Sequence, residues 1–186
     1  MKAGVRALGV AESYRGSTST LAGVVVRASR VVDGFVFGSC TVGGSDATAE
    51  IADMVDRLDR EDVRYLLVSG IAPAWFNVVD LAELHDATGL PVCSITYEAS
   101  EGLESAIRDG FDDPAVAEDR LAIYRAQPER RPVSVADGTV YVRSVGIDEE
   151  RAGEVVRAFT PEGGRPEPLR VARLAASAAD AAGREG

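Results

Sequence analysis

The alternation of apolar and polar positions predicts a sheet that begins antiparallel. Residues 5–11, 21–27 and 31–39 are short runs rich in valine, and glycine or polar turn residues separate them. The third run follows the second after a very short connection. We therefore expect three consecutive strands that form an antiparallel meander.

From residue 47 the pattern predicts helices that alternate with strands. Apolar residues recur at helical spacing over residues 47–60, and residues 63–69 are a buried-type strand. A helix over 78–88 and a strand over 91–96 follow, with an unusually apolar loop at 70–77 before that helix. Strand, helix, strand in succession implies parallel crossovers. The expected fold class is α/β: an antiparallel three-strand meander followed by parallel βαβ units in one mixed sheet, flanked by helices.

The remaining third of the chain predicts more helices and one hairpin. Helical patterns cover residues 102–108, 114–126 and 148–159, with a hairpin at 133–143, and an alanine-rich helix runs from 166 to about 182. The last few residues are expected to fray. With 186 residues, 46% of them apolar, the chain is predicted to form a single domain over residues 1–186.

Composition gives expectations about location and partners. No apolar run is long enough to span a bilayer and no signal-peptide pattern is present, so a cytoplasmic protein without membrane contact is expected. The formal charge of −10 does not favour non-specific binding to nucleic acid, although a phosphate-binding face needs only a few arginines in one place. The candidates for such a face are Arg27, Arg30, Arg143, Arg165, Arg170 and Arg173.

Several enzyme classes are excluded or disfavoured by missing residues. Cys40 and Cys93 lie in apolar runs without metal-type spacing, which indicates reduced core residues. His85 is the only histidine and lies in a predicted helix, so a Ser-His-Asp triad would have to use it. Gly43 and Gly44 are not followed by Gly-Lys-Ser/Thr, which excludes a P-loop.

Three carboxylates stand near predicted element ends. Glu12 lies just past the apolar part of the first strand, Asp46 precedes the first helix, and Asp80 lies near the start of the next. Each has a simpler explanation, as a surface residue or a helix cap. If the loops converge, however, grouped carboxylates require a hard divalent cation between them, and such a site suits phosphodiester hydrolysis.

Aromatic residues suggest how a nucleic acid strand would be held. Trp75 or Phe76 in the apolar loop would wedge into a duplex or stack on a flipped base, and Asn77 would read the edge of that base. Tyr14 and Arg170 are further candidates for substrate contact. The alternative is that the aromatic side chains only cover the sheet.

Six segments together carry a resemblance to a known family. The chain resembles the archaeal family DUF99 (UPF0215), also called endonuclease dU, which is similar to endonuclease V within the ribonuclease H-like fold. The resemblance covers about residues 2–178. The segments are Ala-Leu-Gly-Val-Ala-Glu-Ser-Tyr at 7–14, Val-Asp-Gly-Phe-Val-Phe-Gly at 32–38, Thr-Val-Gly-Gly-Ser-Asp-Ala-Thr at 41–48, Ser-Gly-Ile-Ala-Pro-Ala-Trp-Phe-Asn-Val-Val-Asp at 69–80, Leu-Pro-Val at 90–92 and Pro-Glu-Pro-Leu-Arg at 166–170.

The resemblance implies an endonuclease that uses Mg²⁺ or Mn²⁺ to nick DNA at or near a deaminated base, uracil or hypoxanthine, in repair; RNA stays open as a substrate. Two acidic positions of endonuclease V fall on Ala11 and Ser69, which carry no carboxylate. Glu12 and Asp46 would then hold most of the metal, with Asp80 or Asp33 as third ligand. The alternative is a non-catalytic nucleic-acid-binding relative with a degraded metal site.

Overall fold

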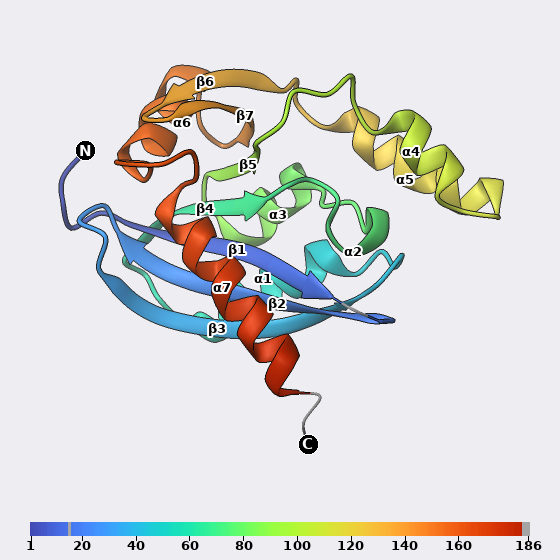
Figure 1. Ribbon diagram of the computed structural model, residues 1–186, viewed down its shortest axis with the longest axis horizontal. Coiled ribbons are helices and arrows are strands. Elements are labelled where there is room, and N and C mark those ends of the chain that lie inside the picture. Colours follow the sequence, from blue (N-terminus) through green and yellow to red (C-terminus); the bar gives the residue numbers. More distant parts are fainter. Residues whose placement is uncertain (15, 184–186) are drawn as a thin grey trace.

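A computed structural model describes residues 1–14 and 16–183, and its strands form one seven-stranded sheet in the order β3-β2-β1-β4-β5-β7-β6 (Figure 1). β1, β2 and β3 pair antiparallel, β1, β4 and β5 pair parallel, and β7 and β6 close the other edge antiparallel. The predicted mixed sheet is therefore confirmed. The strands are β1 (Arg6–Tyr14), β2 (Thr18–Arg27), β3 (Val32–Thr41), β4 (Val63–Ser69), β5 (Val92–Thr96), β6 (Arg131–Val135) and β7 (Gly138–Val145).

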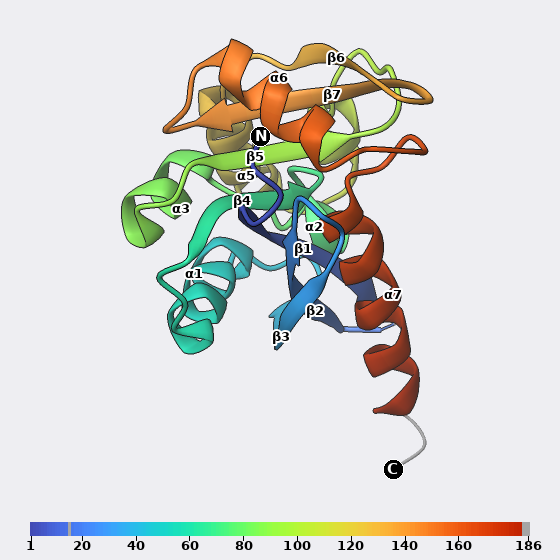
Figure 2. The same cartoon turned by 90° about the vertical axis from the view of Figure 1, so that its left-hand side faces the viewer.

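Helices cover both faces of the sheet, and Figure 2 shows α1 and α3 on one side and α7 on the other. α6 packs with the start of α7 against the β4-β5-β7 part of the sheet, and α4 and α5 pack on each other beside the α1 face. No helix in the described part of the chain is long and apolar enough to cross a membrane. The helices are α1 (Ala47–Leu58), α2 (Pro73–Phe76), α3 (Leu81–Thr88), α4 (Glu104–Asp109), α5 (Pro114–Ala126), α6 (Glu149–Ala158) and α7 (Glu167–Ala182).

Some helices and strands begin or end at other residues than the sequence predicts, because hydrogen bonds set these boundaries. β1 continues to Tyr14, past its apolar part, because it stays paired with β2 to that point. α3 begins at Leu81, not at residue 78, because the Asp80 carboxylate accepts hydrogen bonds from the backbone N–H groups of Ala82 and Glu83 and so caps the helix there. The terminal residues 184–186, for which fraying was expected, lie outside the described residues.

The docking of α7 on the first two strands depends on a glycine. A Cβ atom at Gly9 would lie 2.4 Å from the backbone carbon of Pro168, so only glycine allows β1 and the start of α7 to approach this closely. Farther along the helix, Arg173 donates a hydrogen bond to the backbone oxygen of Glu12. The helix thus covers the end of β1 where the resemblance places a metal ligand.

Candidate nucleic-acid site

The carboxyl ends of the parallel strands β1, β4 and β5 lie at one edge of the sheet, where parallel α/β folds usually bind ligands. Ala11 and Ser69 each lie one residue beyond the paired residues Val10 and Val68. Side chains alternate along a strand, so both point to the face covered by α7 and α6. Ala11 is 3% exposed and packs in the apolar cluster that contains Ala172. Neither position offers a carboxylate to a hard cation.

Glu12 points to the opposite face of the sheet, because it alternates with Ala11 and is in phase with Leu8 and Val10, which pack in the α1-side core. Its carboxylate accepts a hydrogen bond of 2.5 Å from the Ser19 hydroxyl. Ser19 is fully buried on the adjacent strand. The hydrogen bond from Ser19 therefore orients Glu12. However, Glu12 lies on the other face of the sheet from Ala11 and does not supply the carboxylate that is missing at position 11.

Asp46 already has partners for both of its carboxylate oxygens. The backbone N–H of Thr41 donates to both at 3.0 and 3.1 Å, its hydroxyl donates at 2.8 Å, and the Asn77 amide donates at 2.6 Å. Desolvation by the surrounding loops acts to raise the pKa of the Asp46 carboxyl, but the hydrogen bonds from Asn77 and Thr41 outweigh it and hold that pKa below its usual value. The carboxylate is ionised, and its main contacts hold the loop between β3 and α1.

Asn77 connects two loops and is completely buried. Its amide oxygen accepts from the backbone N–H of Ala47 at 3.0 Å, and its amide nitrogen donates to the Thr41 carbonyl at 2.9 Å and to Asp46. The side chain is thus engaged inside the protein and is not on the surface where it would read the edge of a base.

The predicted carboxylates form only a partial group. Ser19, which donates to Glu12, pairs with Cys40, and the next residue, Thr41, donates to Asp46, so Glu12 and Asp46 lie at the same end of the meander. Burial, followed by the charges of Asp46, Glu12 and Glu50, raises the pKa of the Cys40 thiol to about 12. Asp80 instead caps α3.

Asp33 lies at the other end of the meander, since Arg27 and Arg6 bind its carboxylate at 2.5 and 2.6 Å. Those two hydrogen bonds lower the pKa of Asp33 to about 2. Within residues 1–14 and 16–183, no three or more His, Cys, Asp or Glu side chains are grouped so that they would hold a metal ion. The residues present therefore do not fit the metal site that the resemblance implies.

The apolar loop after β4 presents Trp75 through a strained turn. Ala74, Trp75 and Phe76 have φ values of 47°, 58° and 57°, and three consecutive non-glycine residues in the left-handed region are energetically costly. Trp75 is 50% exposed, and its indole N–H donates to the Gly110 carbonyl at 3.0 Å. The ring of Phe76 lies tilted against it, with centroids 5.5 Å apart. The turn holds a large flat side chain partly in solvent beside Gly43.

The strain at Trp75 is measurable by substitution. We expect Trp75→Gly to be more stable than Trp75→Ala by about 1 kcal/mol, because glycine adopts the left-handed conformation without cost. Both variants lose the same ring and the same hydrogen bond, so the difference in unfolding free energy from denaturant titration isolates the backbone term. An alanine variant as stable as the glycine variant would show that the turn is not strained.

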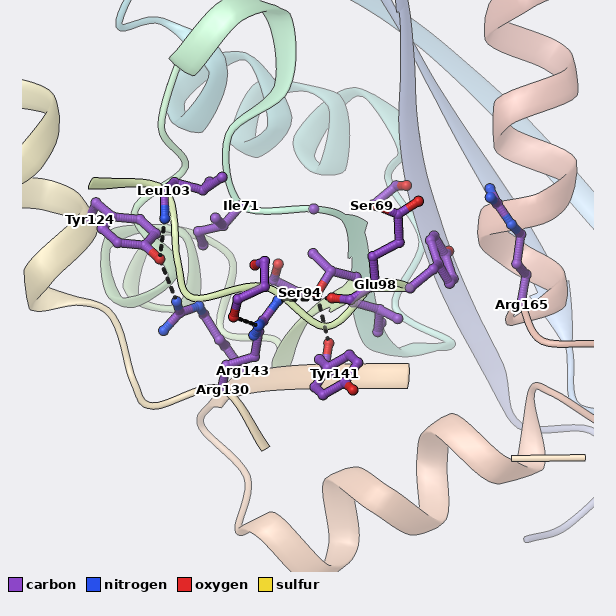
Figure 3. Close-up of a pocket in the computed structure, with 15 residues that line it drawn as sticks. Ser69, Ile71, Ser94, Glu98, Leu103, Tyr124, Arg130, Tyr141, Arg143 and Arg165 are labelled. Carbon is purple, nitrogen blue, oxygen red and sulfur yellow. Dashed lines mark hydrogen bonds between the residues drawn. The ribbon is translucent and has the colours of Figure 1, made fainter. Parts of the chain in front are cut away.

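A cavity of about 360 Å³ opens at the carboxyl ends of β4 and β5 (Figure 3). Three arginines line it, Arg130, Arg143 and Arg165, together with Tyr97, Tyr124 and Tyr141. Arg143 and Arg165 are among the arginines expected to contact phosphate. The tyrosines and Arg130 had no sequence signal beyond their position in or after predicted strands and helices.

Two other predicted contact residues lie outside this cavity's lining. Tyr14 is 38% exposed at the end of β1, and Arg170 forms an ion pair with Glu167 at 2.7 Å. Arg170 lines an adjoining hollow that also contains Arg165. The cavity and this hollow together place arginines along one edge of the sheet.

The sheet order and the helices on both faces define a ribonuclease H-like fold. A family model described as endonuclease dU matches residues 3–180, and the chain belongs to that family. It is 39% identical over 160 residues to a UPF0215 protein of Thermococcus kodakarensis, which covers 85% of this chain and 80% of the relative. Family membership and the fold together support a nuclease that acts on nucleic acid.

Two solved structures share this fold. A protein of unknown function from Archaeoglobus fulgidus superposes with a TM-score of 0.82 at 28% identity, covering 94% of this chain and 97% of that one. Endonuclease V of Ciona intestinalis, solved with a 24mer DNA containing an inosine followed by a ribo-adenosine, gives a TM-score of 0.61 at 12% identity, covering 94% and 84%. The second comparison shows the shared fold.

Proposed function

We propose that this chain acts on nucleic acid strands that carry a deaminated base, uracil or hypoxanthine, as an endonuclease in repair. The observation that carries this proposal is the endonuclease dU match over nearly the whole chain. Its fold is also that of a Ciona intestinalis endonuclease V bound to DNA containing inosine. Trp75, half exposed on its strained turn, supplies a surface on which a base can stack.

The cofactor proposed for cleavage is Mg²⁺ or Mn²⁺, but this chain offers little to hold either ion. Among the described residues, Ser19 alone donates a hydrogen bond to the Glu12 carboxylate, whereas both oxygens of Asp46 already accept hydrogen bonds from Thr41 or Asn77. We therefore assign no reaction step to a metal ion. The geometry supports recognition of the strand more strongly than its cleavage.

Binding without cleavage is the second candidate function, and one observation favours it. Ala11 and Ser69 stand side by side where the pairing of β1 with β4 ends, and the resemblance to endonuclease V places acidic residues at both positions. A protein with these substitutions would retain the fold and the strand-binding surface and lose the nuclease reaction.

A nicking and binding experiment separates the two candidates. Purified protein is incubated with end-labelled strands that contain uracil, inosine or neither, with Mn²⁺ or Mg²⁺, and nicks and bound complexes are scored separately. Glu12→Gln and Asp46→Asn are assayed beside the native chain, after thermal unfolding has shown that both fold. An endonuclease nicks the strands with a deaminated base and loses this activity in Glu12→Gln. Preferential binding of these strands without nicks identifies the second candidate function. If the protein neither nicks nor preferentially binds strands with a deaminated base, both candidate functions are contradicted.

A further inference from the structure

The arginines of the cavity at the β4 and β5 ends are not neutralised by carboxylates. Among the described residues, Arg130, Arg143 and Arg165 form no ion pair, although many other arginines of this acidic chain do. Glu98, which is exposed, is the carboxylate among the cavity-lining residues. The lining therefore carries an excess of positive charge in a protein of net charge −10, which focuses anions on this cavity.

Neutral acceptors and aromatic rings hold these guanidinium groups in place. Arg130 donates to the Ser100 carbonyl at 2.6 Å, and Arg143 donates to the Pro128 carbonyl and, at 3.2 Å, to the hydroxyl of Tyr124. Such contacts fix a guanidinium group without cancelling its charge. Each group is thus both oriented and able to bind an anion.

Each of the three arginines also lies over the ring of a different tyrosine. The distances from the guanidinium carbon to the ring centroid are 4.7, 5.2 and 4.2 Å, within the range of cation–π contacts. The pairs are Arg130 with Tyr141, Arg143 with Tyr124, and Arg165 with Tyr97. Planar arginines set among aromatic rings are a combination suited to a phosphate group attached to a flat base.

The cavity adjoins the place where the carboxylate is missing. Ser69, at the end of β4, lines it together with Arg165 and Tyr97. The guanidinium group of Arg165 lies over the ring of Tyr97, and while burial raises the pKa of the Tyr97 hydroxyl, the charge of Arg165 acts to lower it. At this edge the chain therefore offers a fixed organic cation rather than ligands for a metal ion.

We propose that this cavity binds the phosphate group of a nucleotide through its guanidinium groups and that binding requires no divalent cation. The cavity volume of about 360 Å³ lies at the lower end of the range for small-molecule sites and suits a single nucleotide. The choice of a nucleotide as the ligand rests on the proposed function, whereas the choice of a phosphate rests on the arginines. The nucleotide is either a free monophosphate or the phosphorylated end of a strand.

The test measures binding after treatment with EDTA. Deoxyuridine monophosphate and deoxyuridine are titrated by calorimetry, and a short DNA strand with a 5′-phosphate is compared with the same strand ending in a 5′-hydroxyl. We expect the monophosphate to bind with the same affinity in EDTA and in Mn²⁺, and deoxyuridine to bind at least about tenfold more weakly, since a hydrogen bond to a charged group contributes about 1.5–3 kcal/mol. Tighter binding of the free monophosphate than of the 5′-phosphorylated strand would identify a free nucleotide as the ligand. The reverse order of affinities would identify the phosphorylated end of a strand.

The variants identify the residues. Arg165 is exposed, so the Arg165→Gln variant is expected to fold and to bind the monophosphate about tenfold more weakly than the native chain. Arg143→Gln is the second variant. Arg64→Gln is the matched control, because Arg64 is exposed near the start of β4, far along that strand from the cavity. Binding that needs Mn²⁺, or that falls equally in Arg64→Gln, would overturn the proposal. Equal affinity for thymidine and deoxyuridine monophosphates would leave the phosphate site standing and count against recognition of deaminated bases.

Discussion

Gly9→Ala is expected to destabilise the protein by about 3 kcal/mol, near the upper end of the cost of overpacking a core. The added Cβ would lie 2.4 Å from the backbone carbon, 2.5 Å from the Cβ and 2.6 Å from the carbonyl oxygen of Pro168. Two of these atoms belong to the backbone, which cannot rotate away as a side chain can. Either β1 or α7 must shift. Chemical denaturation, followed by circular dichroism, measures the change in unfolding free energy.

Gly4→Ala is the matched control for this substitution. Gly4 is exposed, and a Cβ atom there meets nothing within 4 Å. Surface substitutions of this kind usually change stability by no more than about 0.5 kcal/mol. If both variants unfolded at the same denaturant concentration, the close approach of α7 to β1 would not be a constraint on this fold. A displaced α7 would also move Arg165, so nucleotide binding should weaken in Gly9→Ala and not in Gly4→Ala.

The sheet was predictable from the sequence because apolar periodicity reports directly on strands and helices. The valine-rich runs gave the meander, and the strand-helix-strand order gave the parallel part. The start of α3 was predicted too early, since Val78 and Val79 are apolar but the chain turns into a helix only after the carboxylate of Asp80. Two hydrogen bonds to that carboxylate set the start of the helix, and the pattern of apolar residues does not reveal them.

The candidate site was less predictable, for two physical reasons. Glu12 is adjacent in sequence to the ligand position that Ala11 occupies, but neighbouring residues of a strand point to opposite faces, so sequence proximity does not bring Glu12 to that position. The cavity arginines come from three separate segments, before β6, within β7 and before α7, and no spacing pattern relates them. Only the topology of the sheet brings Arg130, Arg143 and Arg165 together.

Because Ala11 and Ser69 point to one face where the pairing of β1 with β4 ends, replacing both with aspartate is expected to create a metal-binding site. Side chains opposite each other on neighbouring strands have Cβ atoms about 5 Å apart, which allows two carboxylates to share one ion. Without metal, the double variant should be less stable than the native chain by about 3 kcal/mol, since Ala11 is 3% exposed in an apolar cluster and an unpaired charge there is costly.

Adding Mn²⁺ should restore much of the lost stability, because an ion that binds only the folded state stabilises it by about 2.7 kcal/mol at a hundred times its dissociation constant. Thermal unfolding with and without Mn²⁺ measures this rescue. The control is the double asparagine variant, which has nearly the same shape but no charge and should gain little from the ion. Equal responses in the two variants would mean that the side chains at positions 11 and 69 do not share one ion. A metal-dependent rise in unfolding temperature confined to the aspartate variant would show that the native chain lacks the ligands and retains the geometry.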